Sequence, residues 1–469
     1  MYCLPIGRPL RRKRFLVIRW GTIINRLFAL IVTVAAAGPA IATELENAGR
    51  SQVNQCEAVG LSSCPKPFDA VLPSAADMLT WDQGARVIGF RNTYRLYKGD
   101  VFRTLGRKAY TLLPASYKLP LLRYRMDGHA YRLDDYLRRQ SVVGLLVLKD
   151  RRIVYEYYGG GNGDQTLWTS RSVAKSVVSI LIGIAVKEGL IHSVADPITR
   201  YLPELKGTAW EGVTLRNLLQ HTSGVTWNEH YADPSSDFAR LTRCEAGPAA
   251  SQCVLQLVRT VKREPGMKPG DQWSYNTGGA WLVGRVLEQA TGMTIAKFLE
   301  TRLWSRFAME RDGVWEALLP GQTDMGGHGF NASLRDWGRF SLFVADGGRL
   351  ASGEELLPSD WIAQSVTWTK AKGSVTAATP DGQYGYQWWF GGIDPQRRDT
   401  DNVVQTVRDT FWAEGIYGQA IAINPTEKLV MVQWSTWQEA ETPASLYDEQ
   451  VLFFNALVHA LKQAGVRGK

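Results

Sequence analysis

Two pairs of short apolar stretches stand near opposite ends of the main part of this chain. Residues 142–148 form a continuous apolar run, and residues 153–158, rich in β-branched and aromatic side chains, follow after the turn-forming pair Asp150-Arg151. Residues 419–423 and 429–434 repeat this arrangement around an Asn-Pro-Thr-Glu turn. Extended apolar runs separated by a short polar turn are typical of β-hairpins. The sequence therefore predicts one hairpin in the first half and another near the C-terminus.

Longer apolar segments lie between and after the two hairpins. Residues 176–190 are apolar on nearly every face and exceed the usual length of a strand, which predicts a buried helix ended by Gly189. Residues 281–290 predict a second helix, with Gly292 two residues beyond its end. Residues 446–462 predict an amphipathic closing helix.

Strands at both ends and helices between them define the expected architecture. We predict an α/β fold in which an antiparallel sheet, built from N- and C-terminal strands, is flanked by helices and carries a mainly helical inserted domain. The α/β domain is expected at residues 126–194 and 326–469, and the helical domain at residues 195–325. Residues 43–125 form an N-terminal extension without a recognisable motif, within which residues 81–97 are expected to pack on the main body.

The first 42 residues look like an export signal. Seven basic residues and no acidic residue lie there, and the apolar run of residues 27–42 ends in Ala40-Ile41-Ala42. This order is typical of a secretory signal peptide cleaved after Ala42. An uncleaved anchor is the alternative, but sixteen residues are fewer than the roughly 20 that span a bilayer. We therefore expect an exported, periplasmic protein that begins at Thr43 and has no stable membrane anchor.

The charge balance argues against a nucleic-acid-binding protein. The formal net charge is +9, but seven of those charges lie in the first 42 residues, which leaves +2 for the rest. A nearly neutral body offers no electrostatic reason to bind DNA or RNA. With 469 residues and 45% hydrophobic content, the chain is long enough for one large or two fused domains.

Four cysteines remain after the expected signal peptide. Cys56 and Cys64 form one close pair, and Cys244 and Cys253 form another. An even number of cysteines in an exported protein predicts two disulfides, Cys56–Cys64 and Cys244–Cys253, with four reduced thiols as the alternative. Neither pair has the C-x-x-C spacing of zinc or redox sites, so we expect no metal.

The pattern Ser172-x-x-Lys175 carries the first candidate chemistry. On a helix, residues three apart lie on one face, one turn apart. If burial keeps the Lys175 amine neutral, the amine can take the proton of Ser172. The alternative is an N-cap serine followed by a solvated lysine. A second match at Ser63 is less suitable, since Pro65 and Pro67 flank its lysine.

Further segments give this motif a family context. After Ser172 and Lys175 come His221-Thr222-Ser223-Gly224, then Trp273-Ser274-Tyr275-Asn276-Thr277-Gly278-Gly279, and then Phe411-Trp412-Ala413-Glu414-Gly415, which runs into the last hairpin. In order and rough spacing these segments resemble the serine β-lactamase and penicillin-binding-protein superfamily, and class C β-lactamases within it. They are most similar to the branch that contains 6-aminohexanoate-dimer hydrolase and related esterases. The resemblance covers roughly residues 130–460 and implies a β-lactamase-like fold.

The resemblance implies a role for each of these residues. Ser172 would attack a carbonyl, and Lys175 and Tyr275 would transfer the proton, with a Tyr275 phenolate beside the lysine ammonium as the base. The backbone N–H groups of Ser172 and Ile416 would form the oxyanion hole. His221 would be structural. The substrate-binding positions would be Thr277, Glu414, Gly415 and Tyr231. His328, within Gly326-Gly327-His328-Gly329, is a further position expected to line the site.

Three residues depart from the pattern of β-lactamases. Thr277 stands in place of Asn, and Ala413 and Glu414 stand in place of the Lys and Thr of the Lys-Thr-Gly strand. The strand therefore lacks the cation that holds a β-lactam carboxylate, and Glu414 adds an acid whose charge would repel that carboxylate. The alternatives are that Glu414 points away from the cleft and that Arg408 supplies the missing cation. We expect poor β-lactam hydrolysis and better hydrolysis of uncharged or cationic esters and amides.

The expected function is therefore that of an enzyme. We expect a serine hydrolase that cleaves small-molecule esters or linear amides through an acyl-enzyme at Ser172, without a cofactor. A β-lactamase, a D-aminopeptidase or a D,D-peptidase is the alternative among enzymes, and a penicillin-binding-like protein without turnover is the alternative outside them. The absence of Gly-x-Ser-x-Gly and His-Glu-x-x-His argues against other serine-hydrolase folds and against a zinc hydrolase. The sequence leaves the oligomeric state open.

Overall fold

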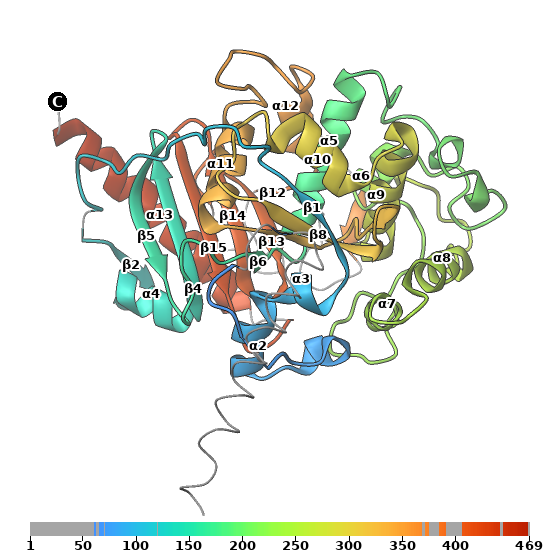
Figure 1. Cartoon of the computed structure of the whole chain (residues 1–469), viewed down its shortest axis with the longest axis horizontal. Helices are drawn as coiled ribbons and strands as arrows, with labels where there is room; N and C mark the ends of the chain where they lie inside the picture. The colour runs from blue at the N-terminus through green and yellow to red at the C-terminus, as the bar shows by residue number, and fades with distance from the viewer. Residues whose placement is uncertain are drawn as a thin grey trace, which may run out of the picture. The chain divides into compact units, whose positions relative to one another are not determined.

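Strands from both halves of the chain form a central six-stranded antiparallel sheet. The computed structural model in Figure 1 describes residues 61, 65–69, 71–119, 121–367, 371–374, 384–390, 406–440 and 444–467. The strands of this sheet are β4 (Val142–Lys149), β5 (Arg152–Tyr158), β12 (Trp389–Phe390), β13 (Phe411–Gly415), β14 (Gln419–Asn424) and β15 (Leu429–Ser435). Their order across the sheet is β12-β13-β14-β15-β4-β5.

Both expected hairpins are present, and they lie next to each other in the sheet. The turn between β4 and β5 passes through Asp150 and Arg151, whose φ angles of 50° and 64° are those of a tight hairpin turn. Strand β15 pairs with β4, with Val432 opposite Leu146. The prediction of one antiparallel sheet built from N- and C-terminal strands is therefore confirmed.

Alternating side chains give the sheet two apolar faces. Leu146 faces α11 (Leu334–Ala345), and a Cβ on Gly338 of that helix would lie only 2.6 Å from Leu146 Cδ2. Leu145 points the other way and belongs to the cluster formed with α13 (Ala444–Arg467). α11 therefore packs on one face and α13 on the other, and α11 comes this close because it presents a glycine.

Two helices begin earlier than their apolar pattern predicts. α5 spans Val173–Lys187 and so includes Lys175, and α9 spans Thr277–Thr291 and so includes Thr277, Gly278 and Gly279. Gly292, with a φ of 68°, ends α9 in the left-handed conformation that glycine favours. Further helices are η1 (Ala75–Thr80), α2 (Gln83–Phe90), α3 (Thr93–Leu96), α4 (Leu133–Arg139), η2 (Ile198–Arg200), η3 (Pro203–Leu205), α6 (Leu215–Leu219), α7 (Asp237–Glu245), α8 (Ala250–Thr260), α10 (Ile295–Leu299), η4 (Glu300–Trp304), α12 (Trp361–Ser365) and η6 (Ile416–Gly418).

The N-terminal extension is part of the core. The ring of Phe90 in α2 lies 5.8 Å from that of Trp168, and Trp81 and Tyr97 belong to the same buried cluster, which confirms that residues 81–97 pack on the main body. The extension also adds a strand to a second sheet, in the order β1-β8-β10-β6, with β9 paired to β8. These strands are β1 (Gly99–Phe102), β6 (Trp168–Thr169), β8 (Gly313–Leu319), β9 (Thr323–Asp324) and β10 (Phe330–Ala332); smaller pairings involve β2 (Arg123–Met126), β3 (His129–Arg132), β7 (Gln272–Trp273) and β11 (Lys372–Ser374).

The segment expected to form a helical domain, residues 195–325, contains helices α6 to α10. In Figure 1, α7 and α8 lie on the side of the molecule away from the six-stranded sheet. The same segment also contains β8, which pairs with β1 of the extension. The boundaries of a separate helical domain stay a prediction.

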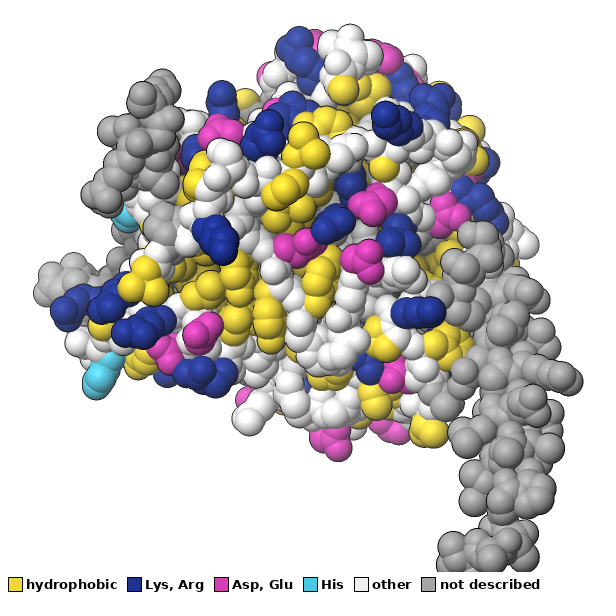
Figure 2. Space-filling view, turned by 60° about the vertical axis from the view of Figure 1, so that its left-hand side comes forward, with side chains coloured by type: hydrophobic (Ala, Val, Ile, Leu, Met, Phe, Trp, Pro, Cys, Tyr) yellow, Lys and Arg dark blue, Asp and Glu magenta, His cyan; other side chains and the backbone are white. Residues whose placement is uncertain are grey.

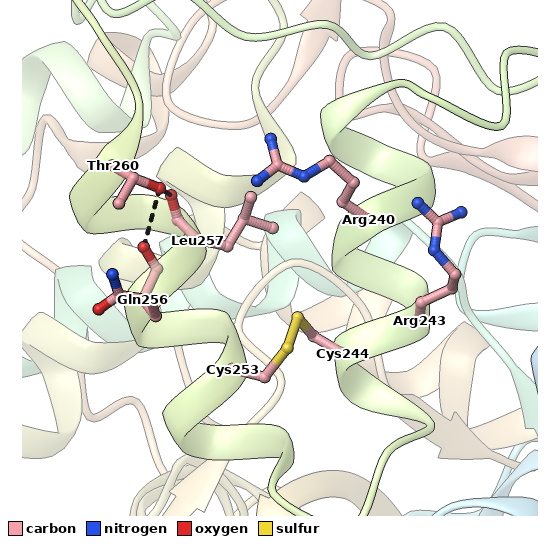
Figure 3. Close-up of a pocket in the computed structure, with 7 residues that line it drawn as sticks. All are labelled: Arg240, Arg243, Cys244, Cys253, Gln256, Leu257 and Thr260. Carbon is pink, nitrogen blue, oxygen red and sulfur yellow. Dashed lines mark hydrogen bonds between the residues drawn. A yellow bond between two sulfur atoms is a disulfide. The ribbon is translucent and has the colours of Figure 1, made fainter.

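One expected disulfide is confirmed. Cys244 in α7 and Cys253 in α8 are bonded, with their Cα atoms 5.3 Å apart. Figure 3 shows the bond beside Arg240 and Arg243, in a surface groove of about 470 Å³ between the two helices. The bond fixes α7 against α8 directly before Glu245, the last residue of α7. The predicted Cys56–Cys64 pair lies outside the described residues.

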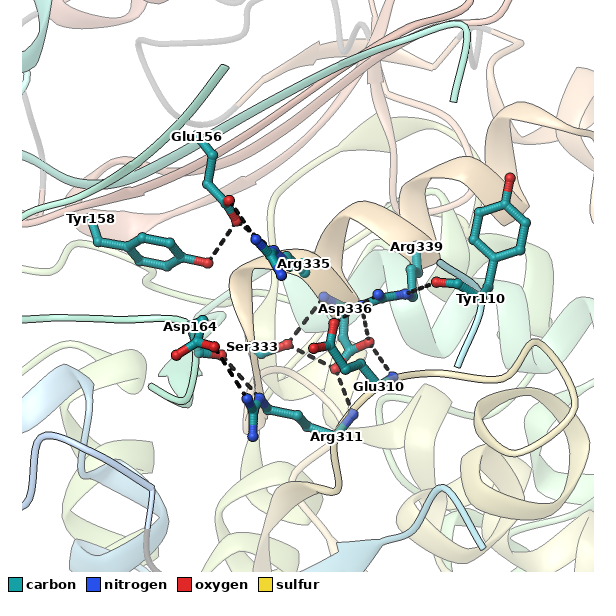
Figure 4. A network of polar contacts seen from close by, with 10 residues as sticks. All are labelled: Tyr110, Glu156, Tyr158, Asp164, Glu310, Arg311, Ser333, Arg335, Asp336 and Arg339. Atoms are coloured by element: carbon teal, nitrogen blue, oxygen red, sulfur yellow. Dashed lines mark hydrogen bonds and ion pairs between the residues drawn. The ribbon is translucent and has the colours of Figure 1, made fainter. Parts of the chain in front are cut away.

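A buried carboxylate fixes the start of α11. Asp336 accepts hydrogen bonds from the backbone N–H groups of Glu310 at 2.8 Å and Arg311 at 3.0 Å, from the Ser333 hydroxyl at 2.8 Å and from Arg339 Nη1 at 2.9 Å (Figure 4). Removing one partner of such a buried pair typically costs about 3–5 kcal/mol. The network therefore ties the turn before β8 firmly to α11.

The surface carries charges of both signs. On the face shown in Figure 2, Lys and Arg side chains are interspersed with Asp and Glu, so this face has no large field of one sign. Across the described ranges, no helix is long and apolar enough to span a membrane. The same ranges hold no group of three His, Cys, Asp or Glu side chains arranged to bind a metal ion.

Candidate active site

Strand β6 leads directly into the turn that presents Ser172. The backbone N–H of Ser170 donates to the carbonyl of Phe330 at 2.8 Å, and Arg171 turns the chain with a φ of 48°. Ser172 then occupies the N-cap of α5, where the helix dipole stabilises negative charge. Because α5 is buried along most of its length, Ser172 and Lys175 stand at the end of a firmly packed helix.

Lys175 lies within hydrogen-bonding distance of the predicted nucleophile. Its Nζ donates to Ser172 Oγ at 2.9 Å and to the carbonyl of Gly327 at 2.8 Å. Burial lowers the pKa of Lys175 to about 8, although Glu229 and Glu245 act to raise it. A substantial fraction of the amine is therefore neutral near pH 8, and a neutral amine can accept the serine proton.

Tyr275 also lies close to Ser172 and Lys175. Lys175 Nζ lies 5.0 Å from the centre of the tyrosine ring. This ring stacks on Trp389 with 5.8 Å between centroids. Burial raises the pKa of Tyr275, and the Ser172 hydroxyl, which is close enough to act on this pKa, lowers it by less, so the phenol is protonated at neutral pH. This electrostatic environment favours Tyr275 as a group that relays a proton, with neutral Lys175 as the base.

His221, which the sequence predicts to be structural, packs against Tyr275. The two ring centroids are 4.5 Å apart, and the carbonyl of His221 accepts a hydrogen bond from the Ser274 N–H at 2.8 Å. Burial, aided by the charge of Lys175, lowers the pKa of His221 well below its usual value. The imidazole is therefore neutral, and its described contacts hold the tyrosine segment in place.

A buried carboxylate that the sequence patterns did not single out completes this centre. Glu229 accepts hydrogen bonds from the Thr277 N–H at 2.9 Å, from the Thr277 hydroxyl and from the Trp227 indole. The Tyr231 hydroxyl donates to it at 3.2 Å. Burial raises the pKa of Glu229, while Lys175 lowers it. The sequence signal was weak, because it consists only of an acid between two aromatic residues.

Replacing Glu229 with glutamine is expected to move the pH dependence of hydrolysis to lower pH. Glutamine keeps the size of the side chain but removes a negative charge that raises the pKa of Lys175. Lys175 would then become neutral at lower pH, so the rising limb of kcat/KM should shift down and activity at pH 6.5 should increase relative to that at pH 9. Glu156→Gln on β5, whose acid pairs with Arg335, is the control and should leave the limb unchanged. An upward shift of the limb in Glu229→Gln would contradict this role.

Gly415 brings the end of β13 against the Ser172 turn. A Cβ at this position would lie 2.7 Å from the carbonyl oxygen of Ser170 and 3.1 Å from the backbone nitrogen of Ser172, so the approach requires glycine. The next residue, Ile416, lines the same pocket as Ser172. The backbones of Ile416 and Ser172 are therefore brought together, as an oxyanion hole requires.

Of the predicted substrate-binding residues, Thr277 and His328 also line this pocket, and Tyr231 lies next to it through Glu229. His328 Nε2 lies 2.9 Å from Glu245, and its Nδ1 lies 3.4 Å from Glu316. Burial lowers the pKa of His328, but the two carboxylates raise it to about 9, so an imidazolium stands here at neutral pH. The sequence patterns did not reveal this cluster of His328, Glu245 and Glu316, because Glu245 lies 83 positions before His328 in the chain.

Glu414 points away from the nucleophile turn. Side chains alternate along β13, so Gly415 faces that turn while Glu414 shares its face with Trp412, whose ring lies 5.3 Å from Phe454 of α13. Within the described part of the chain, neither carboxyl oxygen of Glu414 has a hydrogen-bond partner, and burial raises its pKa well above the usual value. A neutral acid does not repel an anion, so the expected discrimination against β-lactams depends on the missing cation at Ala413.

Residues 132–454 match a protein-family model described as Beta-lactamase. The chain belongs to the beta-lactamase family. The match includes Ser172, Lys175, Tyr275 and Ile416, which form the centre described above. It leaves out η1, α2 and β1, which precede residue 132 and pack on the beta-lactamase region.

Curated relatives support this family and the branch that the motifs indicate. The chain is 28% identical over 335 residues to 6-aminohexanoate-dimer hydrolase from Paenarthrobacter ureafaciens, which covers 68% of this chain and 79% of that protein. It is 24% identical over 236 residues to Beta-lactamase from Escherichia coli (strain K12), which covers 44% of this chain and 57% of that protein. The resemblance identified from the sequence motifs is therefore confirmed.

Solved structures share the beta-lactamase fold. A structure from Bacillus anthracis, described as a 6-aminohexanoate-dimer hydrolase, superimposes with a TM-score of 0.69 at 20% identity and covers 84% of this chain and 99% of its own. A structure from Bacteroides dorei DSM 17855, described as a beta-lactamase, has a TM-score of 0.53 at 20% identity and covers 71% of this chain and 96% of its own. These matches confirm the predicted fold.

Proposed function

We propose that this beta-lactamase-family hydrolase cleaves ester or linear amide bonds through an acyl-enzyme at Ser172. The observation that carries the proposal is the 2.9 Å distance between Lys175 Nζ and Ser172 Oγ in a buried site. The pKa of Lys175, lowered to about 8, supports the proposal because it allows the amine to act as a base near neutral pH.

In the proposed reaction, Ser172 Oγ attacks the substrate carbonyl while neutral Lys175 takes the hydroxyl proton. The oxyanion that forms accepts hydrogen bonds from the backbone N–H groups of Ser172 and Ile416. Tyr275 then gives its proton to the departing oxygen or nitrogen and recovers one from the Lys175 ammonium. The carbon–leaving group bond breaks, and the acyl group stays on Ser172. A water molecule attacks the acyl carbon, and the proton transfers run in reverse to release the acid.

Two considerations favour esters and linear amides as substrates. The curated relative matched over 68% of this chain is named a hydrolase of a linear amide, 6-aminohexanoate dimer. The strand beside the nucleophile carries Ala413 where β-lactamases carry a lysine, and the side chain of Ala413 is fully buried. A carboxylate bound along this strand would therefore lack the charge-assisted hydrogen bond that the lysine would give.

A direct comparison of two chromogenic substrates tests this specificity. We expect kcat/KM for p-nitrophenyl acetate to exceed that for a chromogenic cephalosporin. The cephalosporin carboxylate loses a charge-assisted hydrogen bond worth about 1.5–3 kcal/mol, which weakens binding of the cephalosporin roughly tenfold to a hundredfold. Ser172→Ala measured in parallel should remove both activities, which shows that one serine serves both substrates. A larger kcat/KM for the cephalosporin would contradict the specificity and leave the serine mechanism standing.

A further inference from the structure

The segment before the family match supplies one wall of the pocket beside Ser172. The preceding segment contributes Met78 and Tyr97, and the matched region lines the rest of the pocket with residues that include Ile416, Thr277 and His328. The free volume of the pocket is about 10 Å³, which is room for roughly one water molecule. A substrate group can therefore enter this pocket only if a lining side chain moves.

Met78 lines the pocket from η1, the short helix at residues 75–80. It is the one buried residue of η1, at 3% exposure, whereas its neighbours Asp77 and Thr80 are exposed. Its side chain therefore points inward from a turn that otherwise faces solvent. A methionine side chain is unbranched and flexible, and it fills irregular gaps without a fixed shape. Met78 is therefore a lining side chain that can move when a substrate group enters.

Contacts to the catalytic region hold η1 in place. The Tyr417 hydroxyl donates to the carbonyl of Leu79 at 3.1 Å, and Tyr417 directly follows the predicted oxyanion residue. The Tyr97 hydroxyl donates to the carbonyl of Ala75 at 3.4 Å. These bonds attach both ends of η1, so Met78 has a defined position next to the nucleophile.

We propose that Met78 sets the size of the substrate group that this pocket accepts on one side of the scissile bond. The inference rests on the proposed hydrolysis and narrows its substrate class to esters and amides with a short group on that side. A methyl group requires only a small movement of the Met78 side chain, whereas a propyl group requires its displacement. Residues outside the family's matched region therefore determine specificity in this chain.

Two series of esters test this role. In the first, p-nitrophenyl esters vary the acyl chain from acetate to octanoate, and in the second, acetate esters vary the linear alcohol. Wild-type kcat/KM should fall with chain length in one series. Met78→Ala should raise the butanoate-to-acetate ratio, or the butyl-to-ethyl ratio, by about tenfold, because each buried methylene contributes roughly a factor of four. Met78→Leu keeps the volume and should keep the wild-type ratio.

Leu79→Ala is the matched control, since Leu79 stands on the same short helix but does not line the pocket. It should leave both chain-length profiles unchanged. Unchanged profiles in Met78→Ala, or a wild-type enzyme that does not distinguish chain length in either series, would overturn the inference. The wild-type result needs no variant, so it can overturn the inference even if Met78→Ala fails to fold in a thermal melt. Absence of any Ser172-dependent hydrolysis would instead overturn the proposed function.

Discussion

Replacing Ser172 with alanine is expected to reduce turnover of every ester and amide substrate by about 10⁴-fold or more, since the alanine side chain has no atom that can attack the carbonyl. The fold should survive, because Ser172 occupies a helix N-cap where its side chain makes no capping hydrogen bond. The measurement is kcat for p-nitrophenyl acetate with purified protein, together with intact mass after reaction with a fluorophosphonate. Wild-type protein should gain one adduct, and Ser172→Ala should gain none.

Ser179→Ala is the matched control for this experiment. Ser179 lies on the same helix, is fully buried, and has a hydroxyl without a hydrogen-bond partner in the described structure. Its replacement should leave both turnover and labelling close to the wild-type level. Hydrolysis by Ser172→Ala at a rate near that of the wild type would refute the assignment of the nucleophile.

Replacing Lys175 with alanine is expected to cost at least about a hundredfold in kcat and to remove the rise of activity with pH. The pKa of Lys175 is lowered by burial to about 8. The neutral amine is the active form, so wild-type activity should rise as the pH passes through this value. The alanine variant has no group with that pKa, so its residual rate should lack the rise. The pH profile of kcat/KM between pH 6 and pH 10 measures this difference.

Two variants make the interpretation specific. Lys187→Ala removes an exposed lysine from the last turn of the same helix and should keep both the rate and the rise. Tyr275→Phe should also lose at least about a hundredfold in kcat, because it removes the proton relay, yet it should keep the rise because Lys175 is still present. A profile without a rise in Tyr275→Phe, but with one in Lys175→Ala, would reverse the assigned roles.

The sequence predicted those parts of the fold and site whose signals are local. The hairpins were predictable because their apolar runs and turns are contiguous, and the Cys244–Cys253 bond joins residues only nine positions apart. The apolar pattern alone placed the starts of α5 and α9 too late, since Lys175 in α5 and Thr277, Gly278 and Gly279 in α9 interrupt it. In α5 the motif Ser172-x-x-Lys175, rather than the apolar pattern, indicated the true start of the helix.

Other features could not be predicted because they depend on contacts between distant segments. Glu229 accepts a hydrogen bond from Thr277, and Glu245 contacts His328, which lies 83 positions further along the chain. A local pattern contains no information about which buried acid will meet which partner. The pairing of β1 with β8 is similar, because four residues of the extension find their neighbours more than two hundred positions away.

The pairing of β4 with β15 has a consequence for how the chain acquires its structure during synthesis. Leu146 of β4 pairs with Val432 of β15, so the centre of the sheet cannot form until nearly the whole chain has left the ribosome. Such long-range pairing makes folding slow. Until then, β4 has an unpaired edge of apolar residues, which invites association with other chains. A partly made chain therefore already contains Ser172 and Lys175 but lacks β13 and Ile416, and a chaperone that covers β4 would protect it through this stage.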